Sequence, residues 1–198
     1  MVKDKEFYKK LLAIAIPLAL QNLINVAVGL LDTVMLGQLG EIAMSGSSLG
    51  NQIGFIYNIM NMGLTAGAGV LTSQYWGRKD PESIRKVMSL AYKISMVLGV
   101  VFTVLALTIP ETLMSFYSEE QAVIEAGAVY LRIIAFTYLI SGFTMTSMSI
   151  LRTVGTVKIA LYMYIVSFFV NVFFNYAFIF GKFGFPAMGI AGAALATI

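Results

Sequence analysis

The sequence lacks two residue types that carry much of protein catalysis and metal binding: none of its 198 residues is a cysteine or a histidine. Without cysteine, disulfide bonds and thiolate metal sites are excluded. Without histidine, the commonest general base and metal ligand is missing. No pair of carboxylates that share a pocket is apparent either. We therefore expect that the chain is not an enzyme and that it uses no cofactor.

Charge is also scarce. Charged residues make up 12% of the chain, whereas soluble domains have about 25%. Hydrophobic residues make up 59%, and the mean hydropathy is +0.84. The net charge of +3 is modest, and no basic groove with interleaved aromatic residues is apparent, so we expect no nucleic-acid partner. The composition predicts a protein whose main surroundings are membrane lipid.

Long apolar stretches predict an all-α, polytopic bundle of transmembrane helices. About 20 apolar residues suffice to span a bilayer. The predicted helices cover residues 11–36, 43–75, 87–109, 123–151, 159–180 and 189–198. The last stretch gives a helix of only about 15 Å, half a bilayer. We expect about five complete spans and the truncated start of a sixth, in one domain over residues 1–198 that is part of a larger protein or an assembly-dependent half.

Basic residues alternate between the predicted connections. They lie before the first helix, between the second and third, and between the fourth and fifth: Lys3, Lys5, Lys9, Lys10, Arg78, Lys79, Arg85, Lys86, Arg152 and Lys158. The other connections carry glutamates and one lysine, Lys182. Because cytoplasmic loops are rich in Lys and Arg, we predict a multi-pass protein of the cell (inner) membrane with a cytoplasmic N-terminus. Arg132 lies within a span, and its spacing predicts a pair with Glu125.

Asp32 is the most informative residue, because it is a carboxylate inside the first predicted span. An ionised group in hydrocarbon costs several kcal/mol, so such residues face a bundle interior or a water-filled cavity. Intramembrane acids of this kind mark ion or substrate pathways. Asp32 therefore indicates a site for ions or substrate in a membrane transport protein.

Amide side chains accompany Asp32 on three of the predicted helices. They are Gln21, Asn25, Asn51, Asn58, Asn61, Asn171 and Asn175. Counted from the predicted helix ends, Asp32, Asn51, Asn171 and Asn175 lie roughly 8–15 Å below the outer surface. The sequence therefore predicts that these four side chains meet in one pocket in the outer leaflet. The alternative for the amides is that they only form hydrogen bonds between helices.

Backbone signals are less specific. Pro17 removes a helical hydrogen bond, so it is a candidate hinge, or else a proline tolerated in a membrane helix. Gly63, Gly67 and Gly69 form a row of small residues in the second predicted helix. Such rows let neighbouring backbones approach closely, so we expect packing against another helix there.

Several segments, taken in order, resemble one transporter family. Residues 29–37 resemble helix 1 of multidrug and toxic compound extrusion (MATE) transporters. Residues 74–80 resemble the basic connection after helix 2, and residues 151–155 resemble the connection between helices 4 and 5. Residues 171–181, followed by residues 189–194, resemble helix 5 and the start of helix 6. The resemblance covers essentially the whole chain.

The resemblance implies twelve helices in two six-helix lobes, of which this chain matches the N-terminal lobe. The family implies export of cationic or amphipathic organic compounds in exchange for H⁺ or Na⁺ by alternating access, with the missing C-terminal lobe as partner. The resemblance also implies a cation-binding site formed by Asp32, Asn171 and Asn175, which are the candidate Na⁺ ligands. Some members have an aspartate where this chain has Asn175. The substrate-cavity candidates are Gln21, Asn25, Asn51, Asn58 and Asn61.

Two alternatives remain open. One is a flippase for lipid-linked precursors, whose cavity needs several cationic residues to bind phosphates. Only Lys93 and Arg132 lie within predicted spans, which disfavours this alternative. The other is a half-length membrane scaffold that does not transport.

Overall fold

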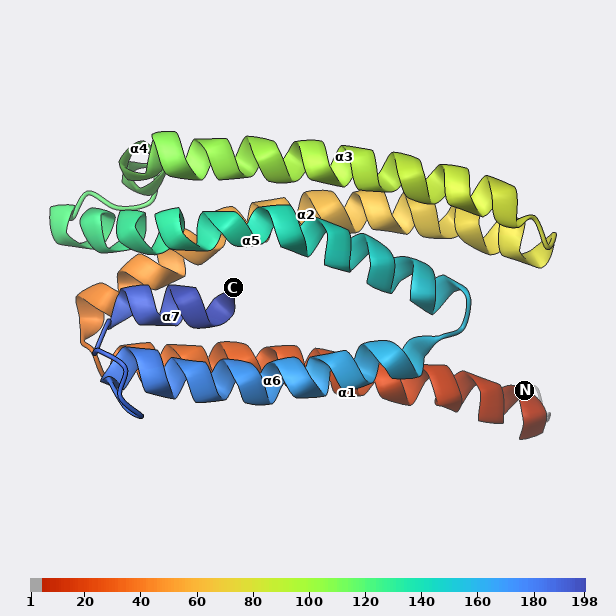
Figure 1. The fold of residues 1–198 in the computed structure, drawn as a ribbon, viewed down its shortest axis with the longest axis horizontal. Coiled ribbons are helices and arrows are strands. Elements are labelled where there is room, and N and C mark those ends of the chain that lie inside the picture. The colour runs from red at the N-terminus through yellow and green to blue at the C-terminus, as the bar shows by residue number, and fades with distance from the viewer. Residues whose placement is uncertain (1–4) are drawn as a thin grey trace.

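The computed structural model describes residues 5–198, so Lys3 lies outside the described residues, as does the side chain of Lys10. Within that range every regular element is a helix (Figure 1). The helices are α1 (Lys5–Gly37), α2 (Glu41–Gly77), α3 (Pro81–Thr108), α4 (Pro110–Ser115), α5 (Gln121–Thr153), α6 (Val157–Phe180) and α7 (Ile190–Thr197). The predicted all-α class is confirmed.

Most helices begin earlier than the apolar stretches indicated, because polar residues form their first turns. Helix α3 begins at Pro81 rather than at residue 87. Asp80 caps it, since its side chain accepts a hydrogen bond from the Ser83 backbone N–H at 3.1 Å. Proline is favoured in a first turn, where its missing N–H is not needed. For the same reason Pro110 begins the short helix α4, which sequence analysis missed.

Four helices within residues 5–198 are long and apolar enough to cross a membrane: α1, α3, α5 and α6. Helix α2 is the longest, with 37 residues, but its glycine, serine and asparagine residues make it less apolar. It is therefore absent from that group, although five complete spans were expected. Helix α1 continues through Pro17 without interruption.

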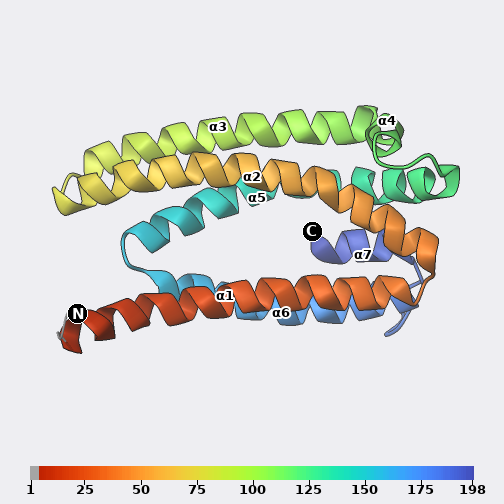
Figure 2. The same cartoon turned by 180° about the vertical axis from the view of Figure 1, so that it is seen from behind.

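The helices form two groups (Figures 1 and 2). Helix α5 packs extensively against α2 and α3, and we call these three helices the packed half. Helices α1 and α6 lie side by side and form the open half. Helix α7 contacts both α6 and α5, so it joins the two halves.

Glycines allow the close approach of helices in the packed half. A Cβ at Gly99 of α3 would lie 2.7 Å from the carbonyl oxygen of Tyr138, and one at Gly50 would meet the Tyr130 ring. Of the predicted row of small residues, Gly69 does pack against α5, since a Cβ there would lie 3.5 Å from the Thr153 Oγ1. The predicted packing at Gly63 and Gly67 is wrong, since a Cβ at either would have no neighbour within 4 Å among the described residues. Those two glycines lie on a face of α2 that α5 does not cover.

The two ends of the bundle differ in charge. The start of α1, the α2–α3 turn and the α5–α6 turn share one end, which we call the basic end (Figure 1). The α1–α2 turn, α4 and the α6–α7 connection lie at the opposite end. The three basic segments of the sequence therefore gather at one end of the molecule.

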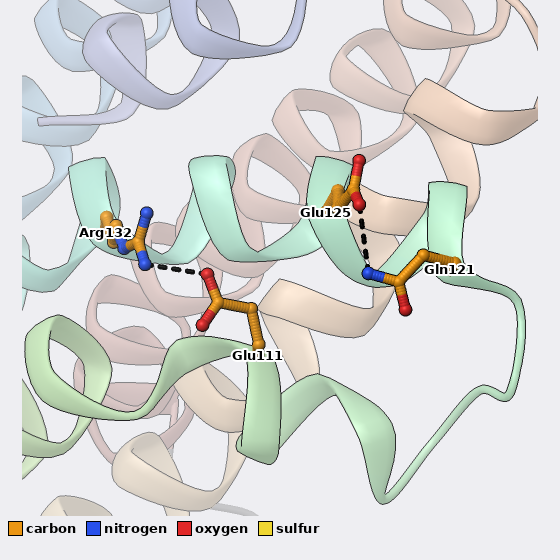
Figure 3. A network of polar contacts seen from close by, with 4 residues as sticks. All are labelled: Glu111, Gln121, Glu125 and Arg132. Atoms are coloured by element: carbon orange, nitrogen blue, oxygen red, sulfur yellow. Dashed lines mark hydrogen bonds and ion pairs between the residues drawn. The ribbon is translucent and has the colours of Figure 1, made fainter.

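The predicted pair of Arg132 with Glu125 is wrong. Arg132 contacts Glu111 at 2.7 Å, while Glu125 accepts a hydrogen bond from Gln121 at 2.9 Å (Figure 3). The reason is α4, whose first turn carries Glu111 to the side of α5. Both contacts are exposed, so they contribute little to stability.

Candidate functional site

Asp32 lies on the face of α1 that meets α6. The Nδ2 of Asn175 donates to the Oδ1 of Asp32 at 2.5 Å and also to the Oδ1 of Asn171 at 2.9 Å. Asn171 and Asn175 share a face of α6 because they are four residues apart. Asn171 in turn donates to the carbonyl oxygen of Ala196 at 3.3 Å. The structure thus joins three of the predicted residues into a hydrogen-bonded chain from α1 through α6 to α7.

A small cavity of about 60 Å³ lies beside Asp32. Four helices contribute to its lining, which consists of Gly29, Asp32, Thr33, Leu36, Met44, Ser47, Ser48, Asn51, Tyr130, Ala193 and Thr197. Its volume is enough for a small cation or a few water molecules. Asn51 accepts a hydrogen bond from the Tyr130 hydroxyl at 3.1 Å, across the α2–α5 contact. Of the four side chains predicted to meet in one pocket, Asp32 and Asn51 line this cavity. Asn171 and Asn175 do not line it and are connected to it only through the hydrogen bond from Asn175 to Asp32.

Asp32 and Asn51 bring side-chain oxygens to this cavity. The Oδ1 of Asn175, which does not line the cavity, is buried and has no hydrogen-bond partner among the described residues. Hard cations prefer carboxylate and amide oxygens, which Asp32 and the neighbouring asparagines supply. Within residues 5–198, no three or more Asp, Glu, His or Cys side chains cluster as metal ligands. A site with one carboxylate among neutral oxygens suits a proton or a monovalent ion better than a divalent metal.

Sequence reasoning missed Tyr130. Its side chain is buried, it packs over Gly50, and its hydroxyl reaches the cavity beside Asp32. The only signal was its residue type, because a tyrosine inside an apolar span needs a partner for its hydroxyl. That signal does not say which partner it finds.

A second, larger cavity of about 470 Å³ lies between α5 and the open half. Its lining consists of Asn25, Thr137, Ile140, Ser141, Thr144, Met145, Met148, Met163, Tyr164, Ser167, Thr197 and Ile198. No charged side chain is among them. Thr197 lines both cavities, so α7 borders each of them. The volume is within the range of small-molecule sites, about 300–1,000 Å³.

The remaining predicted residues lie apart from the small cavity. Asn25 lines the larger cavity, and Asn58 is exposed on α2. Asn61 is fully buried and bonds to Ser95 of α3 at 2.6 Å. Gln21 is also buried, and its partners are Arg152 and the carbonyl oxygen of Val157 at the basic end. The structure therefore does not bring Gln21, Asn58 or Asn61 to either cavity.

A comparison with family models decides the classification. The MatE model matches residues 17–177, a range that begins at Pro17 in α1 and ends near the end of α6. The chain belongs to the MatE family. The resemblance to MATE transporters is thereby confirmed, and the chain is a multi-pass membrane protein of a transporter family.

Curated relatives of this MatE chain extend the match. The chain is 31% identical over 196 residues to a probable multidrug resistance protein NorM from Thermotoga maritima, covering 98% of this chain and 42% of that protein. It is 24% identical to an uncharacterized transporter, YisQ, from Bacillus subtilis, again covering 98% of this chain and 42% of the relative. The chain thus spans about two fifths of the length of these relatives.

Solved structures agree in fold. The chain superposes on a MATE crystal structure in complex with MaD3S with a TM-score of 0.85 and 23% identity, over 96% of this chain and 42% of that one. It superposes equally well, at 22% identity, on an outward-facing multidrug resistance transporter of the MOP superfamily, over 96% of this chain and 41% of that one. These structures establish that the fold is that of one lobe of such a transporter.

Proposed function

We propose that this chain is the N-terminal lobe of a secondary active exporter. The exporter moves cationic or amphipathic organic compounds out of the cell in exchange for H⁺ or Na⁺, and Asp32 binds the coupling ion. The observation that carries the proposal is a single carboxylate in a membrane helix, hydrogen-bonded to Asn175 at the edge of a small cavity. The family match and the NorM relatives support the transport class.

The hydrogen bonds suggest how ion and substrate are coupled. When Asp32 takes up a proton it becomes a donor, and Asn175 no longer needs to donate to it. With Na⁺, Asn175 would instead turn its unpaired Oδ1 toward the ion. Either change alters the bond from Asn175 to Asn171 and, through Asn171, the hold on Ala196 of α7. Because Thr197 lines the larger cavity, ion and substrate then favour different arrangements of α7, which is what exchange requires.

Asn25 is the predicted cavity residue that fits a substrate role. It faces hydroxyl, thioether and tyrosine side chains across a space of small-molecule size. Such a lining accepts amphipathic and aromatic compounds, since methionine adapts to irregular shapes. A phosphate-bearing lipid substrate is not favoured, because the lining has no cationic side chain.

The second lobe is a required partner in this proposal. In transporters built from repeated halves, sites lie at the interface of the halves and access alternates as one half rocks against the other. The chain supplies one wall of such a pathway. We therefore expect that residues 1–198, reconstituted alone, give no gradient-driven flux, unless crosslinking shows a dimer in which a second copy replaces the missing lobe.

The proposed orientation places the basic end in the cytoplasm. A cysteine at Ser118, in the connection between α4 and α5, should react with an impermeant thiol reagent added outside intact cells, whereas a cysteine at Ser83 should not. The chain has no cysteine of its own to interfere. The reverse labelling pattern would place the cavity of Asp32 on the cytoplasmic side and overturn this orientation.

The decisive experiment is export by the full-length protein in proteoliposomes with Na⁺ and H⁺ gradients imposed separately. We expect Asp32→Asn to abolish export driven by either gradient while the protein still folds, because asparagine is nearly isosteric but cannot ionise. If Asp32 only bonds helices together, the amide serves equally well. Normal export by Asp32→Asn at matched expression would therefore refute the site.

A further inference from the structure

Gln21 and Arg152 form a hydrogen-bonded bridge between α1 and the end of α5. The Nη2 of Arg152 donates to the Oε1 of Gln21 at 2.8 Å, and the Nε2 of Gln21 reaches the carbonyl oxygen of Val157 at 3.4 Å. The Gln21 side chain is only 1% exposed, whereas Arg152 is exposed at the basic end. One amide thus binds both sides of the α5–α6 turn to α1.

Within residues 5–198, the bridge lies where the two halves otherwise have little contact. Helices α5 and α6 touch sparingly, and α7 joins the halves nearer the opposite end (Figures 1 and 2). Met148 lines the larger cavity, and Arg152 follows it by about one helical turn on the same helix. The bridge therefore stands between the cavity and the basic end of the molecule.

We propose that the Gln21–Arg152 bridge is the closure between the larger cavity and the basic end, and that it must break before a compound enters from that side. Neither residue lines the cavity, so both are positioning residues that hold α1 against the α5–α6 turn. The proposal rests on the proposed export function for its purpose, but the closure itself can be measured without transport.

The chemistry of the bridge suits a closure that opens. A hydrogen bond from a guanidinium to a neutral amide is stronger than one between neutral groups, but it lacks the charge attraction of an ion pair. Arg152 lies in the last turn of α5, where the helix dipole favours a positive charge, so the guanidinium stays at that end when the bond breaks. A glutamate at residue 21 would convert the bridge into an ion pair and hold it closed.

The test measures access to the cavity from the basic end. In the full-length protein without other cysteines, Ser141→Cys places one thiol in the cavity lining. An impermeant maleimide is added to membrane vesicles on the side of the N-terminus. We expect Gln21→Ala and Arg152→Ala to raise the labelling rate about tenfold, which is the effect expected from the loss of one charge-assisted hydrogen bond. We expect Gln21→Glu to lower the labelling rate.

The matched control is Asn61→Ala. Asn61 is also a buried amide bonded across helices, but it lies between α2 and α3 and away from the bridge. It should leave the labelling rate unchanged, so general loosening of the bundle is distinguished from opening of the closure. Because Arg152 is exposed, Arg152→Ala should fold even if Gln21→Ala does not. Labelling rates equal to the parent in both variants, or raised equally by Asn61→Ala, would overturn the proposal.

This outcome is independent of the proposed function. If the bridge variants change the labelling rate but no ion gradient drives export, the closure proposal stands and the transport proposal is wrong. If the protein exports normally but its labelling rate does not change in the Gln21 and Arg152 variants, the transport proposal stands and the closure proposal is wrong.

Discussion

Within the packed half, buried polar side chains pair across helices, whereas at its boundary with the open half polar side chains also line cavities. Half of the most apolar stretch of α5 is buried within the lobe, against 6% for α1 and 11% for α6. Asn61 and Ser95 satisfy each other between α2 and α3, and Thr103 donates to the carbonyl oxygen of Ala135. Asp32 and Asn175 share one bond beside empty volume. The same residue types therefore stabilise the packed half and provide chemistry at its boundary with the open half.

The difference shows where motion is possible. Close contacts of glycines with backbone atoms of neighbouring helices keep α2, α3 and α5 at fixed separations, because a close-packed interface leaves no free volume for movement. Helices α1 and α6 contact mainly each other and α7, so they can shift relative to α5 at the loss of few contacts. Coupling through Asn175 and closure through Gln21 both lie at this boundary between a rigid and a less constrained group.

The largest expected effect tests the rigidity of the packed half. In Gly99→Val the new Cβ would meet the carbonyl oxygen of Tyr138 at 2.7 Å, and neither backbone can retreat. We expect a loss of about 3 kcal/mol in the free energy of unfolding, at the upper end of overpacking costs. Thermal unfolding in detergent measures it. Gly63→Val is the control, since it has the same helix propensity change but no neighbour within 4 Å. Equal losses in the two variants would remove the basis for calling this half rigid.

The next prediction concerns the open half. Asn175→Ala removes the hydrogen bond that links Asp32 to α6, and with it the bond from Asn175 to Asn171. Because a bond to a charged group is worth about 1.5–3 kcal/mol, we expect gradient-driven export to fall by about tenfold or more. The midpoint of thermal unfolding should fall less than in Gly99→Val, because no backbone is displaced. Export is measured in proteoliposomes against parent protein at the same amount. Full export by Asn175→Ala would show that the bond to Asp32 is structural.

Sequence patterns predicted the fold well and the surroundings of single residues less well. Apolar stretches fix an all-α bundle because lipid demands helices whose backbone bonds are internal. Counting from the predicted helix ends also placed Asp32 and Asn51 at one depth, and they line the same cavity. Position along a helix does not reveal what a side chain meets, however: Asn51 lines a cavity, while Asn58, seven residues later on α2, is exposed. Gly63 illustrates the same limit, because a row of small residues does not say which helix covers it.

The partners of Arg132 and Gln21 were beyond sequence reasoning for a different reason. Arg132 pairs with Glu111 because the short helix α4 folds back onto α5, and six residues leave no periodic signal. Gln21 is a predicted cavity residue on the same helix as Asp32, yet it bonds to Arg152, which is 131 residues away in sequence. Such contacts follow from how the halves are arranged, which hydropathy does not encode.

The smallest effect should come from Asn61, the packed-half counterpart of Asn175. Asn61→Ala leaves the buried Ser95 hydroxyl without its acceptor, and interhelical hydrogen bonds in membranes contribute about 1 kcal/mol. We expect a loss of about that size in thermal unfolding measurements and unchanged export per folded molecule. Asn58→Ala, which removes an exposed amide three residues earlier on α2, should change neither quantity. Asn61 and Asn175 thus differ in role: the Asn61 variant lowers stability without changing transport, whereas the Asn175 variant lowers export per folded molecule. If Asn61→Ala reduced export as strongly as Asn175→Ala at equal stability, the packed half would take part in coupling, and the division between the halves would have to be abandoned.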